Sequence, residues 1–240
     1  MKMTEGSLLD GKVRYAQPRI GFRSGIEPVL LAAAVPARPG ESVLEAGSGA
    51  GATLLCLAAR VRGISGLGVE RDPALAAIAA RNAAANDRPA LTFMVADIAD
   101  SADLGPFDHA CANPPYHPST GTASPDALRD AARRATPELF AVWARAMGQR
   151  LRPRGTLTWI VTAAVVPACI AALQQAACPP SALLPLWPRL GKPAKLVLLQ
   201  GIRGGRDRFR VLPGLVLHDD AGRFTPEAEA ILRDAQALML

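Results

Sequence analysis

The sequence is poor in the residues that build metal centres and disulfide frameworks. Its 240 residues include only three histidines and four cysteines, namely Cys56, Cys111, Cys169 and Cys178. No two cysteines form a C-x-x-C pair, and no histidine stands at a ligand spacing from them, so a metal site is not expected. We expect four buried, reduced thiols, as is typical of a cytosolic protein.

Long hydrophobic runs are also missing. The longest ones, such as residues 29–35 and 157–166, fall short of the roughly 20 residues that a membrane-spanning helix needs. Residues 1–10 lack the apolar core of a signal peptide. We therefore expect a cytoplasmic, soluble protein with no membrane partner. Aromatic residues make up 5% of the chain and hydrophobic residues 50%, with many alanines, which suits helices packed closely on a sheet.

Positive charge is in excess, at a formal net charge of +6. A basic balance favours a polyanionic partner such as RNA. Single arginines are usually solvated surface, but clusters of them are candidates for phosphate contacts. The clusters are Arg14, Arg19 and Arg23; Arg129, Arg133 and Arg134; and Arg203, Arg206, Arg208 and Arg210. Residues 12–23 form an arm of alternating basic and apolar residues. Its pattern fits an edge hairpin and an RNA-facing surface equally well.

Strand and helix patterns alternate along the chain. We expect strands at 42–46, 67–70, 91–95 and 107–112, and helices at 29–35, 52–62 and 72–86. Farther on, we expect helices at 138–151, 167–177 and 226–240, strands at 156–162, 195–202 and 211–217, and an irregular stretch at 179–193. Such alternation predicts βαβ units and a parallel sheet. Since no linker or repeat divides it, we expect one domain over 1–240, with 1–40 an N-terminal arm and helix before the core sheet.

A glycine loop joins the first core strand to its helix. Gly47, Gly49 and Gly51 allow the backbone to approach a ligand closely and direct the N–H groups of the helix toward it. The pattern Gly47-x-Gly49-x-x-Ala52, with Glu70 at the end of the next strand, satisfies the dinucleotide-binding fingerprint. By itself this signal leaves the cofactor open.

Two further acids favour S-adenosylmethionine as the cofactor. Glu45 precedes the glycines, where a carboxylate suits an ammonium group and would repel a pyrophosphate. Asp97 follows the third strand, where it could accept a hydrogen bond from an adenine amine. Glu70 would then accept from both ribose hydroxyls. The structural alternative is that these are ordinary exposed acids at strand ends. Three acids at the carboxyl ends of three consecutive strands make that alternative the weaker one.

The stretch Asn113-Pro114-Pro115-Tyr116 follows the strand at 107–112. The carboxyl edge of an open α/β sheet is where ligands bind. The side-chain oxygen of Asn113 and the carbonyl of Pro114 could accept the two hydrogens of a planar NH2 group, while Tyr116 stacks on its ring. A proline-rich turn with a locally satisfied asparagine is the structural alternative, and it would be preferred for an isolated motif.

Together these motifs resemble class I S-adenosylmethionine-dependent methyltransferases that act on amino groups. More narrowly, the chain is similar to bacterial tRNA(Val) adenine-N6 methyltransferases, which also have a Gly-x-acid pattern like Gly25 to Glu27, usually with Asp as the acid. The resemblance implies a Rossmann-like α/β fold. Its mostly parallel seven-stranded sheet would have an antiparallel strand near the C-terminus and helices on both faces.

The resemblance also implies the function and the site. The expected substrate is adenine N6 of the adenosine at position 37 in the tRNA anticodon loop, modified by a monomer. The implied catalytic residues are Asn113, Pro114 and Tyr116. The implied S-adenosylmethionine-binding residues are Glu45, Gly47, Gly49, Gly51, Glu70, Asp97, Gly25 and Glu27.

Other functions remain open from the residues alone. Enzymes that methylate a glutamine amide in release factors share the Asn-Pro-Pro-Tyr stretch, although they usually carry a separate N-terminal helical domain, and only about forty residues precede the glycine-loop strand here. DNA adenine methylation lacks an evident base-reading domain. A nicotinamide-dependent oxidoreductase or a non-catalytic nucleotide-binding module would fit the glycine loop. Neither of them would require the Asn-Pro-Pro-Tyr stretch from Asn113 to Tyr116.

Overall fold

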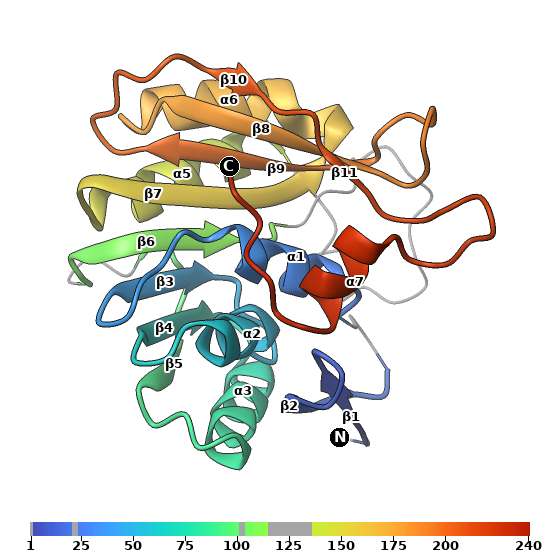
Figure 1. Cartoon of the computed structure of the whole chain (residues 1–240). Helices are drawn as coiled ribbons and strands as arrows, with labels where there is room; N and C mark the ends of the chain where they lie inside the picture. The colour runs from blue at the N-terminus through green and yellow to red at the C-terminus, as the bar shows by residue number, and fades with distance from the viewer. Residues whose placement is uncertain (1, 21–23, 101–103, 115–135) are drawn as a thin grey trace.

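The computed structural model describes residues 2–20, 24–100, 104–114 and 136–240. A nine-stranded sheet forms the centre of this part of the chain, in the order β10-β8-β9-β7-β6-β3-β4-β5, with β11 also paired to β8 (Figure 1). The long strands are β3 Ser42–Ala46, β4 Ser65–Glu70, β5 Leu91–Val95, β6 Phe107–Ala112, β7 Leu151–Thr162, β8 Pro180–Trp187 and β9 Leu196–Ile202. The short ones are β10 Arg210–Val211 and β11 Leu215–Val216.

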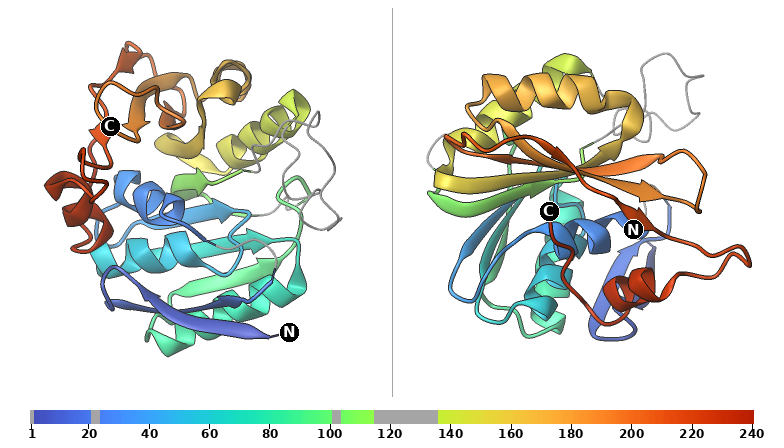
Figure 2. Two further views of the ribbon diagram at one scale, coloured as in Figure 1. Left: turned by 90° about the vertical axis from the view of Figure 1, so that its right-hand side faces the viewer. Right: turned by 45° about the horizontal axis from the view of Figure 1, so that its top comes forward.

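Helices cover both faces of this sheet (Figure 2). On one face lie α1 Glu27–Ala34, α2 Ala52–Arg60 and α3 Pro73–Ala85. On the other lie α5 Pro137–Gln149 and α6 Val166–Gln175, preceded by the 3-10 turn η1 Ala163–Val165. A short helix, α7 Pro226–Leu232, packs against α1 near the C-terminus.

Alternating strand residues build two separate cores, because successive side chains of a strand point to opposite faces. Strand residues of the core beside α1 and α2 include Val43, Cys111, Ile160 and Leu198. Those of the core beside α5 and α6 include Leu44, Ala110, Trp159 and Leu199. Strands buried on both faces are typical of parallel sheets covered by helices.

The predicted fold class is confirmed. Strands β3 to β9 form a seven-stranded sheet, extended at one edge by the two-residue strands β10 and β11. All its pairings are parallel except those of β9, which runs antiparallel to both β7 and β8. The four cysteines are free and buried, as predicted. Within the described part of the chain, no helix combines the length and apolar character needed to cross a bilayer.

The prediction that residues 179–193 are irregular was wrong, because strand β8 occupies Pro180–Trp187. The prolines in this stretch had argued against a strand, since a proline lacks the N–H that a central strand needs. Pro180 is the first residue of β8, a position at which proline is tolerated. Pro185 lies in the strand whose outer side is paired only with the short β10 and β11. Helix α7 is also shorter than the predicted 226–240, since it ends at Leu232.

The N-terminal arm forms a hairpin of β1 Met3–Leu8 and β2 Val13–Pro18, apart from the main sheet. Two asparagines one turn apart, Asn82 within α3 and Asn86 at its C-cap, bind the backbone of the hairpin. Asn86 accepts from the Arg14 N–H at 2.8 Å and donates to the Arg14 carbonyl at 2.7 Å. Asn82 makes the same pair of bonds with Ala16, at 3.0 and 2.9 Å. The predicted hairpin is therefore confirmed, while an RNA-facing role of the arm stays a prediction.

Candidate active site

Two cavities lie at opposite edges of the sheet. The larger, of about 340 Å³, is lined by residues 58–64 and 87–91 near the amino ends of β4 and β5. The smaller, of about 50 Å³, lies at the carboxyl edge, between the hairpin, the glycine loop and the end of β6. Size favours the first cavity, but ligands of open α/β sheets bind at the carboxyl ends of the strands. The chemistry also favours the second, which we call the carboxyl-edge cleft.

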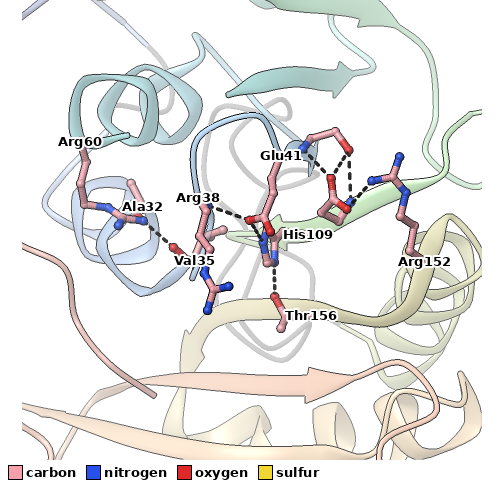
Figure 3. Close-up of polar contacts among 10 residues, drawn as sticks. Ala32, Val35, Arg38, Glu41, Arg60, His109, Arg152 and Thr156 are labelled. Atoms are coloured by element: carbon pink, nitrogen blue, oxygen red, sulfur yellow. Dashed lines mark hydrogen bonds and ion pairs between the residues drawn. The ribbon is translucent and has the colours of Figure 1, made fainter. Parts of the chain in front are cut away.

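The amino edge carries a different polar network, shown in Figure 3. His109 on β6 contacts Glu41 through Nε2 at 2.9 Å and Thr156 through Nδ1 at 2.8 Å. Glu41 also accepts from the Arg38 N–H at 2.7 Å. This network joins the start of β6 to β7 and to the turn before β3. It is satisfied internally and lies away from the cleft.

The glycine loop adopts the geometry that its sequence predicts. Gly47, Gly49 and Gly51 all have positive φ angles, of 66°, 54° and 85°, which other residues adopt at a cost. A Cβ on Gly47 would also lie 2.9 Å from the Trp143 ring, whereas one on Gly49 would meet no atom within 4 Å. Gly49 therefore faces open space. Gly47 and Gly49 line the cleft, and Gly51 is the N-cap of α2.

Glu45 lies at the base of the cleft with a side chain almost fully buried, at 3% exposure. Burial raises the pKa of its carboxyl group to about 8, and the nearby charge of Glu70 adds to the rise. Hydrogen bonds from the Thr53 side chain and the Leu54 backbone oppose it. The Oε2 atom is buried and has no hydrogen-bond partner among the described residues. Glu45 is thus a buried acceptor that a cationic donor would satisfy.

Glu70 forms hydrogen bonds with the backbone of the glycine loop and of the turn before α3. Its Oε2 accepts a hydrogen bond from the Gly49 N–H at 2.9 Å, and its Oε1 accepts from the Asp72 N–H at 2.9 Å. Asp72 caps α3 in turn, accepting from the Ala74 and Leu75 N–H groups, as predicted. Each oxygen of the Glu70 carboxylate keeps a second lone pair for a further donor.

Asn113 follows the last residue of β6 and lines the cleft together with Glu45. Its Oδ1 is buried and accepts no hydrogen bond from the described residues. Buried amide oxygens are nearly always hydrogen-bonded, so an exception calls for an explanation. The structural alternative, in which the asparagine satisfies local backbone groups through this oxygen, does not describe the observed site.

The other predicted residues lie around this centre. Pro114 is buried directly after Asn113, and Tyr116 lies outside the described residues. Asp97 is exposed two residues beyond β5, and its Oδ1 accepts from the Ala99 N–H at 2.9 Å. Gly25 and Glu27 lie at the start of α1 but do not line the cleft. Their neighbours Ser24 and Pro28 do.

Part of the cleft lining comes from segments that none of the sequence motifs includes. Tyr15 and Gln17 of β2 form one wall, and both reach Ser24. The Tyr15 hydroxyl lies 2.9 Å from the Ser24 Oγ, and the Gln17 Oε1 accepts from the Ser24 N–H at 3.0 Å. Burial raises the pKa of Tyr15 to about 12. The alternation of polar and apolar residues in the arm indicated a strand but not what the strand would face.

Comparison with known proteins finds methyltransferases. Residues 43–138 match the family described as "Methyltransferase domain". The tRNA1(Val) (adenine(37)-N6)-methyltransferase of Actinobacillus succinogenes is 33% identical over 153 residues, covering 60% of this chain and 63% of that protein. The release factor glutamine methyltransferase of Rhodospirillum rubrum is 44% identical over 87 residues, covering 35% of this chain and 26% of that protein. The chain therefore spans less than two thirds of either relative.

A solved structure shares the fold over most of the chain. The predicted O-methyltransferase Atu636 of Agrobacterium tumefaciens superimposes with a TM-score of 0.73 at 24% identity, covering 89% of this chain and 99% of that one. At this identity the likeness concerns the fold alone.

Proposed function

We propose that this protein is an S-adenosylmethionine-dependent N-methyltransferase, because residues 43–138 match the family described as "Methyltransferase domain" and the sheet has the class I topology. Its target is an exocyclic amino group, and the substrate we favour is adenine N6 of the adenosine at position 37 in the anticodon loop of a tRNA.

One observation carries the proposal: Glu45 and Asn113 line the same cleft, and their buried oxygens Oε2 and Oδ1 lack donors among the described residues, as the hydroxyl of Ser48, also in the lining, lacks a partner there. Leaving a buried polar atom unpaired costs about 1–3 kcal/mol. A ligand that brings one ammonium and one amine would satisfy both. S-adenosylmethionine carries the ammonium, and the substrate carries the amine. A dinucleotide would bring a pyrophosphate toward the Glu45 carboxylate instead.

The chain's own residues supply binding and orientation. Glu45 holds the ammonium group, and Glu70 holds the ribose hydroxyls with the lone pairs that Gly49 and Asp72 leave free. When bound, the cofactor supplies an electrophilic methyl group on a sulfonium. The Asn113 side-chain oxygen accepts a hydrogen bond from one N–H of the substrate amine, and the Pro114 carbonyl accepts one from the other N–H, which turns the nitrogen lone pair toward the methyl group. Positioning of this kind is a large part of catalysis.

tRNA is favoured as the substrate by two observations. The alignment with the tRNA-modifying relative extends over 153 residues, against 87 for the glutamine methyltransferase. The net charge of +6 suits a polyanionic partner. Methylation of a glutamine amide in a release factor is the second candidate, because the shorter alignment has the higher identity, 44%. Both substrates present an NH2 group to the same acceptors.

A direct assay separates these candidates. The protein is incubated with labelled S-adenosylmethionine and either an unmodified tRNA(Val) transcript, the same transcript with guanosine at position 37, or a release factor. We expect label only in the first transcript, recovered as N6-methyladenosine by mass spectrometry of its nucleosides. Label in the release factor alone would establish the second candidate. Thermal stabilisation by S-adenosylhomocysteine and not by NAD tests the cofactor separately.

A further inference from the structure

The antiparallel direction of β9 decides which basic segments lie near the cleft. Leu196, the first residue of β9, pairs with Thr162 at the carboxyl end of β7. Ile202, the last residue of β9, pairs with Thr156, which on its other side pairs with His109 in the first half of β6. The loop of residues 188–195, between β8 and β9, therefore lies at the carboxyl edge, like Asn113. Figure 1 shows this loop and the ends of β3 and β6 at the same side of the sheet.

The arginine cluster at 203–210 lies elsewhere. Arg203 follows β9 at the amino edge, where its N–H bonds the Gly155 carbonyl at 2.9 Å. Arg210 pairs with Ala182 near the start of β8, which is also toward the amino edge. Asp207, inside the same segment, forms an ion pair with Arg154 at 3.0 Å. The cluster therefore lies toward the amino edge, away from the cleft, a position that the sequence alone did not indicate.

The carboxyl-edge loop is a built structure. The Lys192 N–H bonds the Arg189 carbonyl at 3.1 Å, closing a turn in which Gly191 has a φ of 72°, the geometry that favours glycine. Such a turn brings its first and fourth residues within about 7 Å of one another. Arg189 and Lys192 therefore flank Leu190, which stands at the tip with 81% of its surface exposed.

Both ends of the loop are fastened. The Ala163 N–H bonds the Lys195 carbonyl at 2.9 Å, and the His218 N–H bonds the Pro188 carbonyl at 3.2 Å. The loop thus presents its charged side chains from a fixed backbone, which lowers the entropy lost when a partner binds.

Charge on this loop is of one sign. Arg189, Lys192 and Lys195 are exposed, residues 188–195 contain no acid, and these three cations form no ion pair within the described part of the chain. In the neighbouring turn, Asp219 is paired with Arg223 at 2.9 Å, and Asp220 is the remaining acid. The loop and this turn together keep an excess of positive charge.

We propose that the loop of residues 188–195 binds the RNA backbone of the substrate, with Arg189 and Lys192 contacting phosphates and Leu190 packing against a ribose or an unstacked base. The proposal rests on the proposed tRNA substrate. Strand β8 lies three strands from β6, which is about 15 Å at a spacing of about 4.8 Å. An RNA hairpin with one base in the cleft extends across that distance.

The test compares two double variants at opposite edges of the sheet. The loop variant, Arg189→Ala with Lys192→Ala, removes two cations of the loop. The far-edge variant, Arg206→Ala with Arg208→Ala, removes two cations of the arginine cluster at 203–210. Binding of an unmodified tRNA(Val) transcript is measured between 50 and 200 mM salt, a range over which phosphate contacts change affinity strongly. Calorimetry with S-adenosylhomocysteine shows whether each variant keeps its cleft.

Each phosphate contact contributes about 0.7–0.9 to the slope of log affinity against log salt. We expect the loop variant to lower the slope by about 1.5 and the far-edge variant to leave it unchanged, with cofactor affinity normal in both. Equal slopes for the wild type and the loop variant, or a larger fall for the far-edge variant, would overturn the proposal while tRNA methylation still stands. A wild-type protein that neither binds nor methylates the transcript would refute the tRNA function itself, and the loop's role with it.

Discussion

The side-chain amide of Asn82 donates a hydrogen bond to the carbonyl oxygen of Ala50, over 3.0 Å. Asn82 belongs to α3 and Ala50 to the glycine loop, and both are buried. The same amide also holds the Ala16 backbone of the hairpin through two bonds. One side chain thus joins two walls of the carboxyl-edge cleft.

We expect Asn82→Ala to weaken S-adenosylhomocysteine binding by tenfold or more, because it frees both the hairpin and the loop that would contact the cofactor. The matched control is Asn86→Ala, since Asn86 makes the same paired bonds with Arg14 of the hairpin but none with the loop. Calorimetry well below the melting temperature measures both. Equal losses of affinity would show that Asn82 only anchors the hairpin.

Removing the unpaired acceptor at the end of β6 should separate catalysis from cofactor binding. We expect Asn113→Ala to lower single-turnover methylation by about 10²-fold or more, as loss of a positioned hydrogen-bonding group does. S-adenosylhomocysteine affinity should stay near that of the wild type, because the proposed partner of Asn113 is the amine of the substrate and not the cofactor. An unchanged single-turnover rate would show that this side chain does not hold the amine.

The raised pKa of Glu45 makes stability depend on pH. An unfolded glutamate releases its proton near its ordinary pKa, whereas the buried group keeps it until about pH 8. Between those values the unfolded state binds fewer protons, so Glu45 lowers stability progressively as pH rises toward 8. We expect Glu45→Gln to raise the melting temperature at pH 8 and to change it little at pH 4. A uniform change at both values would contradict ionisation as the cause.

Cofactor binding should also release a proton from Glu45. An ammonium group beside the carboxylate lowers its pKa, so a group that is protonated at pH 7 in the free protein ionises in the complex. Calorimetric titration in two buffers of different ionisation enthalpy counts the protons. We expect up to one released at pH 7 in the wild type and none in Glu45→Gln. Equal counts in the two proteins would place the ammonium elsewhere.

Glu70→Ala should weaken cofactor binding, because Glu70 both supports the Gly49 N–H and keeps lone pairs for a ribose. Glu41→Ala is the control, since Glu41 also accepts from a backbone N–H but lies in the amino-edge network of Figure 3. We expect a loss of S-adenosylhomocysteine affinity only in the first variant. A similar loss in both would indicate general destabilisation of the sheet.

Local patterns predicted much of the fold. Strands β3, β5 and β6 begin and end at the predicted residues, because each is a short, mostly apolar run bounded by turn residues. Asp72 caps α3 because its side chain reaches the first free N–H groups of the helix, a contact that depends only on neighbours in sequence. Strand β8 was missed because its tolerance of Pro185 depends on its place near the sheet edge.

For this protein, the sequence by itself determined the βαβ order, the glycine loop and the acids and asparagine at strand ends, since these depend on residue type and short spacing. Only the tertiary structure decided that Tyr15 and Gln17 line the cleft, that Asn82 joins two of its walls, and that the basic loop at 188–195, and not the cluster at 203–210, shares its edge. The physical reason is that the direction of β9 and the docking of the hairpin arise from contacts between residues far apart in the chain.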